Sequence, residues 1–323
     1  MACAGTGASS ESKAAVRPSL RGLCAVNPQL AWASGSSATI LRTTDAGQNW
    51  QTLSPPDDSA GLDFRDLEAW SPQRAIVMAA GPAAASGLWL TESGGRAWIK
   101  ILDCPWAEGF FDGIAFWDQT SGLLVGDPVA GALMILRTEN GGRTWTPASV
   151  MPRTETGEFA FAASGTSVCV QPGGLAWIGT GGAGAARVWR TDDGGKVWQA
   201  VASPLFQGRE SAGIFSIDFA DARHGVIVGG DYLLPDAREK TAAWTDDGGL
   251  TWTLAAVPPG GYRSCVSFSP DGARWICTGP EGTDVSADGG KSWQPLSKPG
   301  FHAVSAGFAV GSDRRMAVLK FPD

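Results

Sequence analysis

A hydroxyl side chain followed two residues later by a carboxylate or similar short acceptor occurs six times, each time within the motif Ser/Thr-x-Asp/Asn/Ser-x-Gly-x-x-Trp. One such carboxylate could act as a general acid or base, but a single active site has no use for six. The hydroxyl and the acceptor can instead hydrogen-bond backbone N–H groups across a tight turn. Gly supplies the positive φ of that turn, and Trp buries a large ring. We therefore interpret the motif as structural. Its Asp and Trp residues are Asp45, Trp50, Trp98, Trp145, Asp193, Trp198, Asp247, Trp252, Asp288 and Trp293.

The other reactive residue types argue against several kinds of function. Two His residues cannot form a multi-His metal centre, and the chain has no Cys-x-x-Cys pair. We therefore expect neither a metal nor a cofactor. The formal net charge of −7 argues against a general nucleic-acid surface. No apolar run reaches the roughly 18 residues of a membrane helix.

Charged and aromatic residues that could bind a ligand lie between the motifs. Three of the four Tyr and His residues are among them, whereas His224 lies in a turn and is expected to be solvated. The alternative is that these side chains cap turns or pair with one another. The candidate ligand- or partner-binding residues are Arg65, Asp66, Phe111, Asp112, Asp127, Glu158, Arg187, Asp231, Tyr232, Tyr262, Arg263 and His302.

The elements that position these residues follow from the motif spacing. Successive motif tryptophans are 48, 47, 53, 54 and 41 residues apart, and about 40–50 residues is the length of a four-stranded propeller blade. Short apolar runs bounded by Gly, Pro, Asp or Ser predict the strands of each blade. In the second repeat these are Phe64–Trp70, Ala75–Ala80, Gly87–Thr91 and Ala97–Leu102, and in the third they are Gly113–Trp117, Ser121–Val125, Ala132–Arg137 and Thr144–Pro147.

The chain after the sixth motif contains three further strand-like runs, Phe301–Phe308, Ala309–Gly311 and Arg315–Phe321. Residues Ser12–Pro18 could add the outer strand and close the ring, which would remove exposed sheet edges. We predict an all-β, seven-bladed propeller of four-stranded blades over residues 12–323, with six blades as the alternative. Residues 1–11 would be a flexible tether.

Blade connectivity separates two faces of such a ring. The motif turns join strands three and four on one face. The links between blades, and the turns between strands two and three, emerge on the other face, which we call the loop face. Propellers usually bind partners there, around the mouth of the central channel. The candidate residues are therefore predicted to gather opposite the motif turns.

Two features of the cysteines bear on location. Cys3, followed by a small and Ser-rich stretch, resembles the mature start of a bacterial lipoprotein, so we expect an exported protein, periplasmic or extracellular, that is lipid-anchored through Cys3. A disordered terminus is the alternative.

Cys265 and Cys277 flank a turn centred on Asp271 and could form a cross-strand disulfide. Alternatively they are small apolar core residues, like Cys24 and Cys169 in other repeats.

The motifs, the length and four further segments resemble bacterial Asp-box (BNR-repeat) propellers of the YCF48-like, photosystem II stability-assembly factor-like kind. The resemblance covers the chain from about Leu20. It implies a non-catalytic role in which a basic groove holds a partner protein, although this chain is acidic overall. The four segments are Asp63-Phe-Arg-Asp66, Phe110-Phe-Asp112, Gly230-Asp-Tyr232 and Gly261-Tyr-Arg263.

More distantly, the chain resembles sialidases, which are enzymes with the same motif. Their chemistry needs an Arg cluster for the substrate carboxylate, a Tyr nucleophile activated by Glu, and an Asp acid/base. The Arg-Ile-Pro sequence that typically precedes their first motif is absent. This resemblance implies Arg65, Arg187 and Arg263 for the cluster, Tyr262 and Glu158 for the nucleophile and its activator, and Asp66 or Asp112 for the acid/base.

Our leading hypothesis is a non-catalytic, monomeric binding propeller. It would engage a protein partner, or a small or glycan ligand, through the loop face at the channel mouth. The alternative is a glycoside hydrolase or another propeller enzyme. Its catalytic residues would be Tyr262, Glu158, Asp112 and Asp66, with the Arg cluster binding the substrate.

Overall fold

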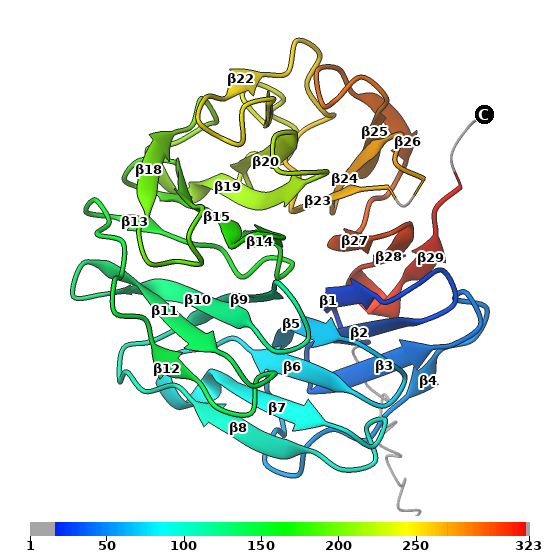
Figure 1. The fold of residues 1–323 in the computed structure, drawn as a ribbon. Coiled ribbons are helices and arrows are strands. Elements are labelled where there is room, and N and C mark those ends of the chain that lie inside the picture. Colours follow the sequence, from blue (N-terminus) through cyan, green and yellow to red (C-terminus); the bar gives the residue numbers. More distant parts are fainter. Residues whose placement is uncertain (1–16, 270, 321–323) are drawn as a thin grey trace, which may run out of the picture.

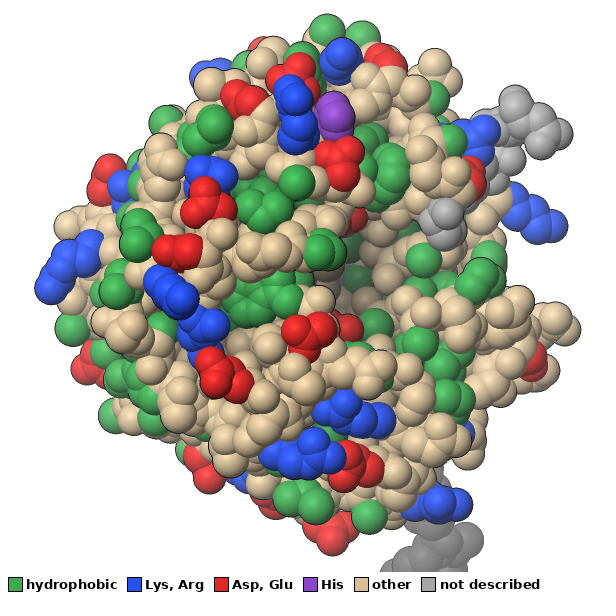
Figure 2. All heavy atoms as spheres, in the orientation of Figure 1, with side chains coloured by type: hydrophobic (Ala, Val, Ile, Leu, Met, Phe, Trp, Pro, Cys, Tyr) green, Lys and Arg blue, Asp and Glu red, His purple; other side chains and the backbone are tan. Residues whose placement is uncertain are grey.

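The computed structural model describes residues 17–269 and 271–320. Seven antiparallel sheets are arranged as blades around a central channel (Figure 1). This confirms the predicted seven-bladed β-propeller. In Figure 2, acidic and basic side chains are interspersed over the face in view, and the molecule is hollowed at the centre of the ring.

Blades one to three each contain four strands that pair in sequence order. The inner strand of each blade lines the channel, and the outer strand is short and exposed. Blade one consists of β1 Leu20–Ala25, β2 Ala31–Gly35, β3 Thr39–Thr43 and β4 Gln51–Thr52. Blade two consists of β5 Phe64–Ala69, β6 Ala75–Ala79, β7 Gly87–Thr91 and β8 Ile99–Asp103, with the 3₁₀ turn η1 Ala83–Ala85 between β6 and β7. Blade three consists of β9 Phe111–Phe116, β10 Gly122–Val129, β11 Ala132–Thr138 and β12 Thr146–Pro147.

Blades four to six repeat the plan, and two short strands extend the sheet of blade five at its inner edge. Blade four consists of β14 Val168–Gln171, β15 Leu175–Gly179, β17 Arg187–Thr191 and β18 Gln199–Ala202. Blade five consists of β19 Arg209–Phe219, β20 Gly225–Asp231, β21 Ala242–Thr245 and β22 Thr253–Leu254, extended by β13 Glu158–Phe159 and β16 Gly181–Gly182. Blade six consists of β23 Cys265–Phe268, β24 Trp275–Gly279, β25 Gly282–Ser286 and β26 Gln294–Ser297.

Blade seven contains three strands within the described residues, β27 Ala303–Ser305, β28 Phe308–Val310 and β29 Met316–Val318, with the 3₁₀ turn η2 Ser312–Arg314. The run Phe301–Phe308, predicted as one strand, is split by a tight turn. Ala306 and Gly307 both have positive φ there, 45° and 88°, so the chain reverses before Phe308. An alternation of apolar residues alone does not reveal a turn that lacks Asn or Asp.

The two ends of the described chain meet beside blade seven. The Leu20 N–H donates to the Gly311 carbonyl at 3.0 Å, and the Arg314 N–H donates to the Pro18 carbonyl at 2.7 Å. The Ala25 N–H adds a hydrogen bond to Ser305 Oγ at 3.2 Å. These contacts join Pro18 and β1 to blade seven. Of the predicted outer strand Ser12–Pro18, residues 12–16 lie outside the described part, as does the tether that includes Cys3.

The motif turns make the hydrogen bonds inferred for them. In the first, the Thr43 hydroxyl donates to Asp45 Oδ1 at 2.9 Å and accepts from the Gly47 N–H at 3.0 Å. Asp45 Oδ1 also accepts from the Asn49 N–H at 2.9 Å. Where Ser93 replaces Asp, its Oγ accepts the equivalent bond at 2.9 Å. Asn140 Oδ1 accepts it at 3.0 Å in the third turn. A short acceptor is therefore sufficient at this position.

Large apolar side chains fill the spaces between neighbouring blades. Trp32, Trp89 and Trp177 are completely buried, and so are the central strands around them. Of the motif tryptophans, Trp145 and Trp293 are buried, whereas the other four are half-buried. Burial of apolar surface between blades is therefore the main force that holds the ring together.

The proposed disulfide between Cys265 and Cys277 is absent. Cys265 pairs with Thr278 and Cys277 pairs with Val266, so the hairpin register differs by one residue from a direct Cys–Cys pairing. Because successive side chains point to opposite faces of a strand, Cys265 packs with blades one and seven, and Cys277 with blade five. Both are free, buried thiols, which confirms the apolar interpretation.

Candidate functional site at the channel mouth

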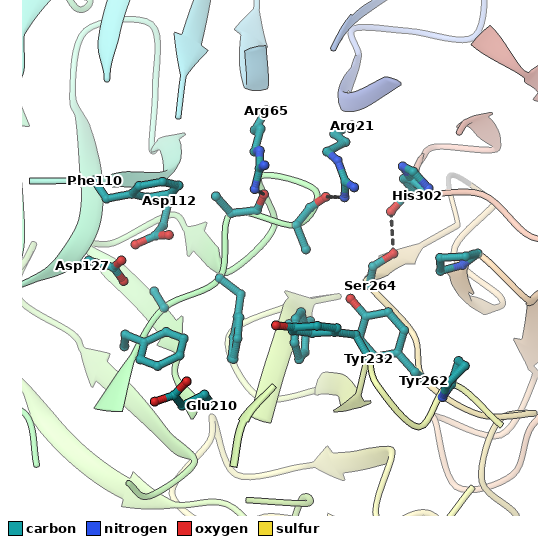
Figure 3. A pocket seen from close by; sticks show the side chains of 18 of the residues that line it. Arg21, Arg65, Phe110, Asp112, Asp127, Glu210, Tyr232, Tyr262, Ser264 and His302 are labelled. Atoms are coloured by element: carbon teal, nitrogen blue, oxygen red, sulfur yellow. Dashed lines mark hydrogen bonds between the residues drawn. The ribbon is translucent and has the colours of Figure 1, made fainter. Parts of the chain in front are cut away.

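A cavity of about 710 Å³ opens where the inner strands begin, at the loop-face end of the channel. Residues at or just before the first inner strand of each blade contribute to it, because every inner strand starts on this face (Figure 3). Its charged and polar lining residues are Arg21, Arg65, Asp112, Asp127, Glu210, Ser264, Glu281 and His302. Its aromatic lining residues are Phe110, Phe159, Phe161, Phe215, Tyr232 and Tyr262.

Packed aromatic rings form one wall of the cavity. Phe161 stacks on Phe215 with ring centroids 3.8 Å apart. Tyr262 and Tyr232 meet the Phe215 ring edge-on, at 4.8 and 6.2 Å. The backbone of Gly213 allows this arrangement, since its φ is 152° and an added Cβ would lie 3.1 Å from the Phe161 ring. The wall is a rigid apolar surface on which a ligand side chain or ring can stack.

Two guanidinium groups line another side of the cavity. Arg21 Nη1 donates to the Ala163 carbonyl at 3.1 Å, and Arg65 Nη1 donates to the Ala162 carbonyl at 3.3 Å. Arg65 Nε also binds Asp63 at 2.8 Å. Burial, with the neighbouring Arg65, lowers the pKa of Arg21. The two arginines hold the segment before blade four in place and keep positive charge at the mouth.

Asp112 and Asp127 form a carboxyl pair in the lining of the cavity (Figure 3). Burial and the neighbouring Asp127 raise the pKa of Asp112 well above its usual range. Burial also raises the pKa of Asp127 to about 6. Like charges this close cannot both be retained in a buried site, so the pair holds at least one proton near neutral pH.

His302 lies on the opposite side of the cavity and is held by two serines. Its Nδ1 and Nε2 are each 3.2 Å from a hydroxyl oxygen, those of Ser19 and Ser312. Burial, Arg21 and Arg315 lower its pKa to about 4. The ring is therefore neutral at pH 7.

Six of the twelve candidate residues line this cavity. They are Arg65, Asp112, Asp127, Tyr232, Tyr262 and His302. The other six candidates do not line it. They are Asp66, Phe111, Glu158, Arg187, Asp231 and Arg263, and each makes contacts within the protein.

Asp66 and Phe111 are buried beside residues that face the cavity. Asp66 accepts hydrogen bonds from the N–H groups of Leu67 and Ile114, both at 2.7 Å, and so ties blade two to blade three. The Phe111 side chain is completely buried among the apolar residues of these two blades. Both residues alternate along a strand with neighbours that point into the channel.

Glu158 and Arg187 bind each other rather than a ligand. Glu158 Oε1 accepts from Arg187 Nε at 3.1 Å, from Thr180 Oγ1 at 2.7 Å and from Trp189 Nε1 at 3.0 Å. Burial alone would raise the pKa of Glu158, but these hydrogen bonds outweigh it and lower the pKa. Glu158 faces a neighbouring groove instead of the main cavity.

Arg263 and Asp231 are likewise occupied. Arg263 Nε donates to Asp284 at 2.7 Å in a buried ion pair. Asp231 accepts from the Leu233 N–H at 2.9 Å and from Arg209 at 3.2 Å. The ion pairs Arg263–Asp284 and Arg209–Asp231 hold loops that border the cavity.

The sialidase-like constellation is therefore not assembled. Of its three arginines, only Arg65 reaches the cavity, since Arg187 and Arg263 are paired elsewhere. The Glu158 carboxylate is bound to Arg187, and burial raises the pKa of Tyr262.

Several lining residues were not among the candidates. Arg21, Phe159, Phe161, Glu210 and Phe215 all contribute to the cavity. One signal could have found Arg21, because it follows the first residue of β1 as Arg65 follows the first residue of β5. No sequence motif marks Phe159 or Phe215, and the fold places both at the channel mouth.

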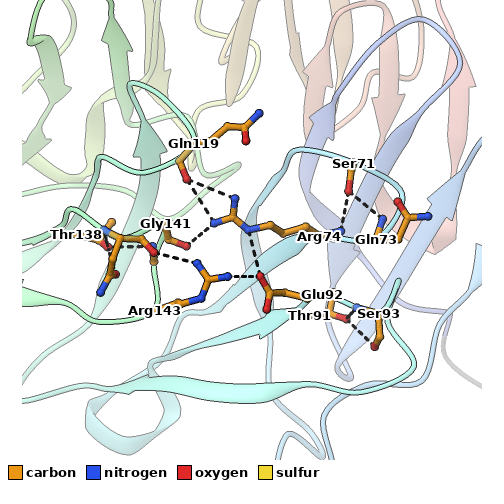
Figure 4. Close-up of polar contacts among 12 residues, drawn as sticks. Ser71, Gln73, Arg74, Thr91, Glu92, Ser93, Gln119, Thr138, Gly141 and Arg143 are labelled. Atoms are coloured by element: carbon orange, nitrogen blue, oxygen red, sulfur yellow. Dashed lines mark hydrogen bonds and ion pairs between the residues drawn. The ribbon is translucent and has the colours of Figure 1, made fainter.

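The opposite face is occupied by contacts that fasten the motif turns to neighbouring blades (Figure 4). Arg74 of blade two donates to the carbonyls of Gly141, at 2.7 Å, and Gln119, at 3.4 Å, in blade three. In the other direction, Arg143 of blade three forms an ion pair with Glu92 of blade two. These exposed charges are used between blades, which leaves the loop face as the better candidate for a ligand.

Comparison with solved structures places this fold among known propellers. YCF48 from Cyanidioschyzon merolae aligns over 94% of this chain and 96% of its own, with a TM-score of 0.62 and 19% identity. The chain resembles YCF48 in fold. A structure of YCF48 bound to D1 peptide aligns over 94% and 93%, with a TM-score of 0.61 and 16% identity. The WD40 propeller domain of Doa1 aligns over 94% and 93%, with a TM-score of 0.61 and 10% identity.

The resemblance to YCF48 predicted from the sequence is confirmed in the structure. At these identities the likeness concerns the fold alone. No protein-family model and no curated protein matches the chain. Within residues 17–269 and 271–320, no cluster of three or more His, Cys, Asp or Glu side chains could hold a metal ion, and no helix is long and apolar enough to cross a membrane.

Proposed function

We propose that this protein is a non-catalytic binding propeller that holds a segment of a partner protein in the cavity at the channel mouth. The observation that carries the proposal is the cavity itself. It combines a packed aromatic wall with charged groups from several blades, and it opens to solvent on the loop face. Concave sites with an apolar surface and a few oriented polar groups are typical binding sites.

The structural neighbour bound to a peptide supports this choice of ligand class. That YCF48 structure contains D1 peptide, and it shares the seven-bladed architecture across nearly the whole chain. An exposed apolar rim supports it further. Tyr232 and Leu233, at the edge of the cavity, are 49% and 69% exposed, and such residues favour contact with an apolar side chain of a partner.

Peptide selection would test the proposal. A random peptide library is displayed on phage and selected on the purified full chain, and the affinities of the selected peptides are then measured by calorimetry. Tyr232→Ala should weaken them at least about tenfold, which corresponds to about 1.4 kcal/mol for an aromatic anchor. Leu250→Ala is the matched control, because Leu250 is 47% exposed on the motif face. It should change the affinities less than twofold.

Two results would refute the proposal. Either no peptide is selected, or the selected peptides lose affinity with Leu250→Ala and not with Tyr232→Ala. The second result would move the interaction to the motif face.

A further inference from the structure

A second groove continues outward from the carboxyl end of the cavity. It has a volume of about 570 Å³ and shares Asp127 and Phe159 with the main cavity. Glu108, Glu155 and Glu158 also line it, and no Lys or Arg does. Arg187 neutralises Glu158 and approaches Glu155 at 3.4 Å. Together, Asp112, Asp127, Glu108 and Glu155 form a track that we call the acidic track.

The inner end of this track contains buried oxygens that only the pair itself can satisfy. Asp112 is 1% exposed. Within the described part of the chain, Asp112 Oδ2 and Asp127 Oδ1 are buried and accept no hydrogen bond from any other group, and the two carboxyl groups hydrogen-bond each other when a proton is present. Both residues line the cavity, and their carboxyl groups point toward one another in Figure 3. A buried carboxyl oxygen without a donor carries a desolvation penalty, which a ligand with N–H donors would relieve.

The nearest protein cation does not provide this relief. Arg65 is engaged by Asp63 and by the Ala162 carbonyl. Among the described residues, no lysine lines either the cavity or the groove. The described part of the chain therefore provides no cation that is free to pair with these two carboxyl groups.

We propose that the carboxyl pair Asp112–Asp127 receives a basic side chain, lysine or arginine, of the bound partner segment, and that the acidic track accommodates further basic residues next to it. This inference rests on the proposed function and specifies the chemistry of the partner. An ammonium carries three N–H donors and a guanidinium five, enough for both free oxygens. Phe110 and Phe159 line the same end of the cavity and offer apolar surface to the methylene stem of the side chain.

Charge favours a basic partner over an acidic one. The cavity is lined by two arginines and four carboxyl groups, and the groove adds three more glutamates. Both arginines already donate to backbone carbonyls. An acidic segment would meet Glu108, Glu155 and the carboxyl pair at close range, and like charges at an interface are unfavourable.

The inference also predicts that the affinity for a basic segment depends on pH. A cation binds the ionised pair more strongly than the protonated pair, and burial raises the pKa of Asp127 to about 6. Affinity should therefore rise as pH increases through about 6. His302 stays neutral over this range, because its pKa is about 4. The other charged or titratable residues that line the cavity and the groove are Arg21, Arg65, Glu108, Glu155, Glu158, Glu210, Tyr232, Tyr262, Glu281 and His302.

Calorimetry with defined peptides would test the inference. Acetylated, amidated pentalysine and pentaglutamate are titrated into the full chain at low salt, from pH 5 to pH 7.5. Pentalysine should bind with a stoichiometry of one, more tightly at pH 7.5 than at pH 5, and pentaglutamate should not bind. Asp127→Asn should weaken pentalysine at least tenfold. Asp246→Asn removes an exposed carboxylate of the motif face and should leave the affinity within twofold.

Asp112→Asn provides a second variant at the pair, and thermal melts report whether each variant is folded. The inference is overturned if pentalysine does not bind, if it binds Asp127→Asn as tightly as the unaltered chain, or if Asp246→Asn causes an equal loss. Failure here is distinguishable from failure of the proposed function. The selected peptides could lack basic residues and still lose affinity with Tyr232→Ala. That result would support the proposed binding function and contradict only the inference that the partner segment is basic.

Discussion

At the scale of single residues, the charged groups of the loop face divide into two classes. Arg65, Asp112 and Asp127 face the cavity, whereas Glu158 and Arg263 are each buried in an ion pair. A buried pair is stable only while both partners are present, because removing one leaves the other charge uncompensated. The two classes should therefore respond differently to substitution. Cavity residues should affect binding, and paired residues should affect stability.

Glu158→Ala tests the second class. It removes the acceptor of Arg187, Thr180 and Trp189, so the free energy of unfolding should fall by about 3–5 kcal/mol. Glu155→Ala is the control, because Glu155 contacts the same arginine with its side chain 58% exposed. It should cost less than about 1 kcal/mol. Urea unfolding followed by tryptophan fluorescence measures both, and equal effects would contradict the assignment of Glu158 to the architecture.

At the scale of elements, the motif turn is a small, self-contained hydrogen-bonded unit. In the fifth turn, Asp247 Oδ1 accepts from the Thr245 hydroxyl at 2.7 Å and from the N–H groups of Leu250 and Thr251, both at 3.0 Å. These bonds resemble those of a helix N-cap, where a short acceptor satisfies orphan N–H groups. The turn fixes the start of the outer strand and contributes nothing to the cavity.

Asp247→Ala should therefore lower stability by about 1–2 kcal/mol, the range seen for loss of a capping side chain, while peptide binding stays unchanged. The preceding Asp246 is exposed, and Asp246→Ala should have no measurable effect. Chemical denaturation gives the stability, and the calorimetric peptide assay gives the binding. A loss of binding in the Asp247 variant, without unfolding, would show that the motif face takes part in recognition.

At the scale of the whole molecule, two sets of carboxyl groups respond to pH in opposite directions. Hydrogen bonds from Thr120 and Ser121 hold the pKa of Asp118 at about 2, and hydrogen bonds outweigh burial to hold the pKa of Asp247 at about 2. Burial raises the pKa of Glu68 to about 7 and that of Asp218 to about 6. The first set belongs to exposed turns and the second to the inner strands.

Thermal stability should consequently peak near pH 4–5. The first set stabilises the folded state above the ordinary carboxyl pKa of about 4, and this contribution is lost as pH falls toward 2. The second set retains protons that the unfolded chain has released, so stability declines as pH rises from about 4 to 7. Melting temperatures from pH 2 to pH 8 measure the profile. Glu68→Gln should flatten the decline, and the exposed Glu239→Gln should not. A maximum at pH 7 or above would contradict the prediction.

Ring closure sets the geometry of the binding cavity at this same scale. Arg21 lies on the first strand and His302 just before the last blade, yet both line one cavity because Leu20 pairs with Gly311. Residues on the inner strands or in the segments before them line the mouth. The ring brings these contributions together only when all seven blades are in place.

The sequence by itself determined the architecture and the motif turns. Each turn is built from hydrogen bonds within five residues, such as those of Thr43, Asp45 and Asn49, and therefore depends on local sequence alone. The regular spacing of the turns then sets the length of six blades, and the strand-like runs after the sixth motif indicate the seventh. The loop face followed from the same connectivity, and half of the candidate residues do line its cavity.

The tertiary structure alone decided which loop residues meet. Arg65 faces the cavity and its neighbour Asp66 ties two blades together, because adjacent side chains on a strand point to opposite sides. Glu158 binds Arg187, 29 residues later in the sequence. Glu158 lies on the short strand β13, which no sequence motif predicts. Register and ring closure set these long-range pairings, and both depend on how complete blades pack rather than on any local pattern.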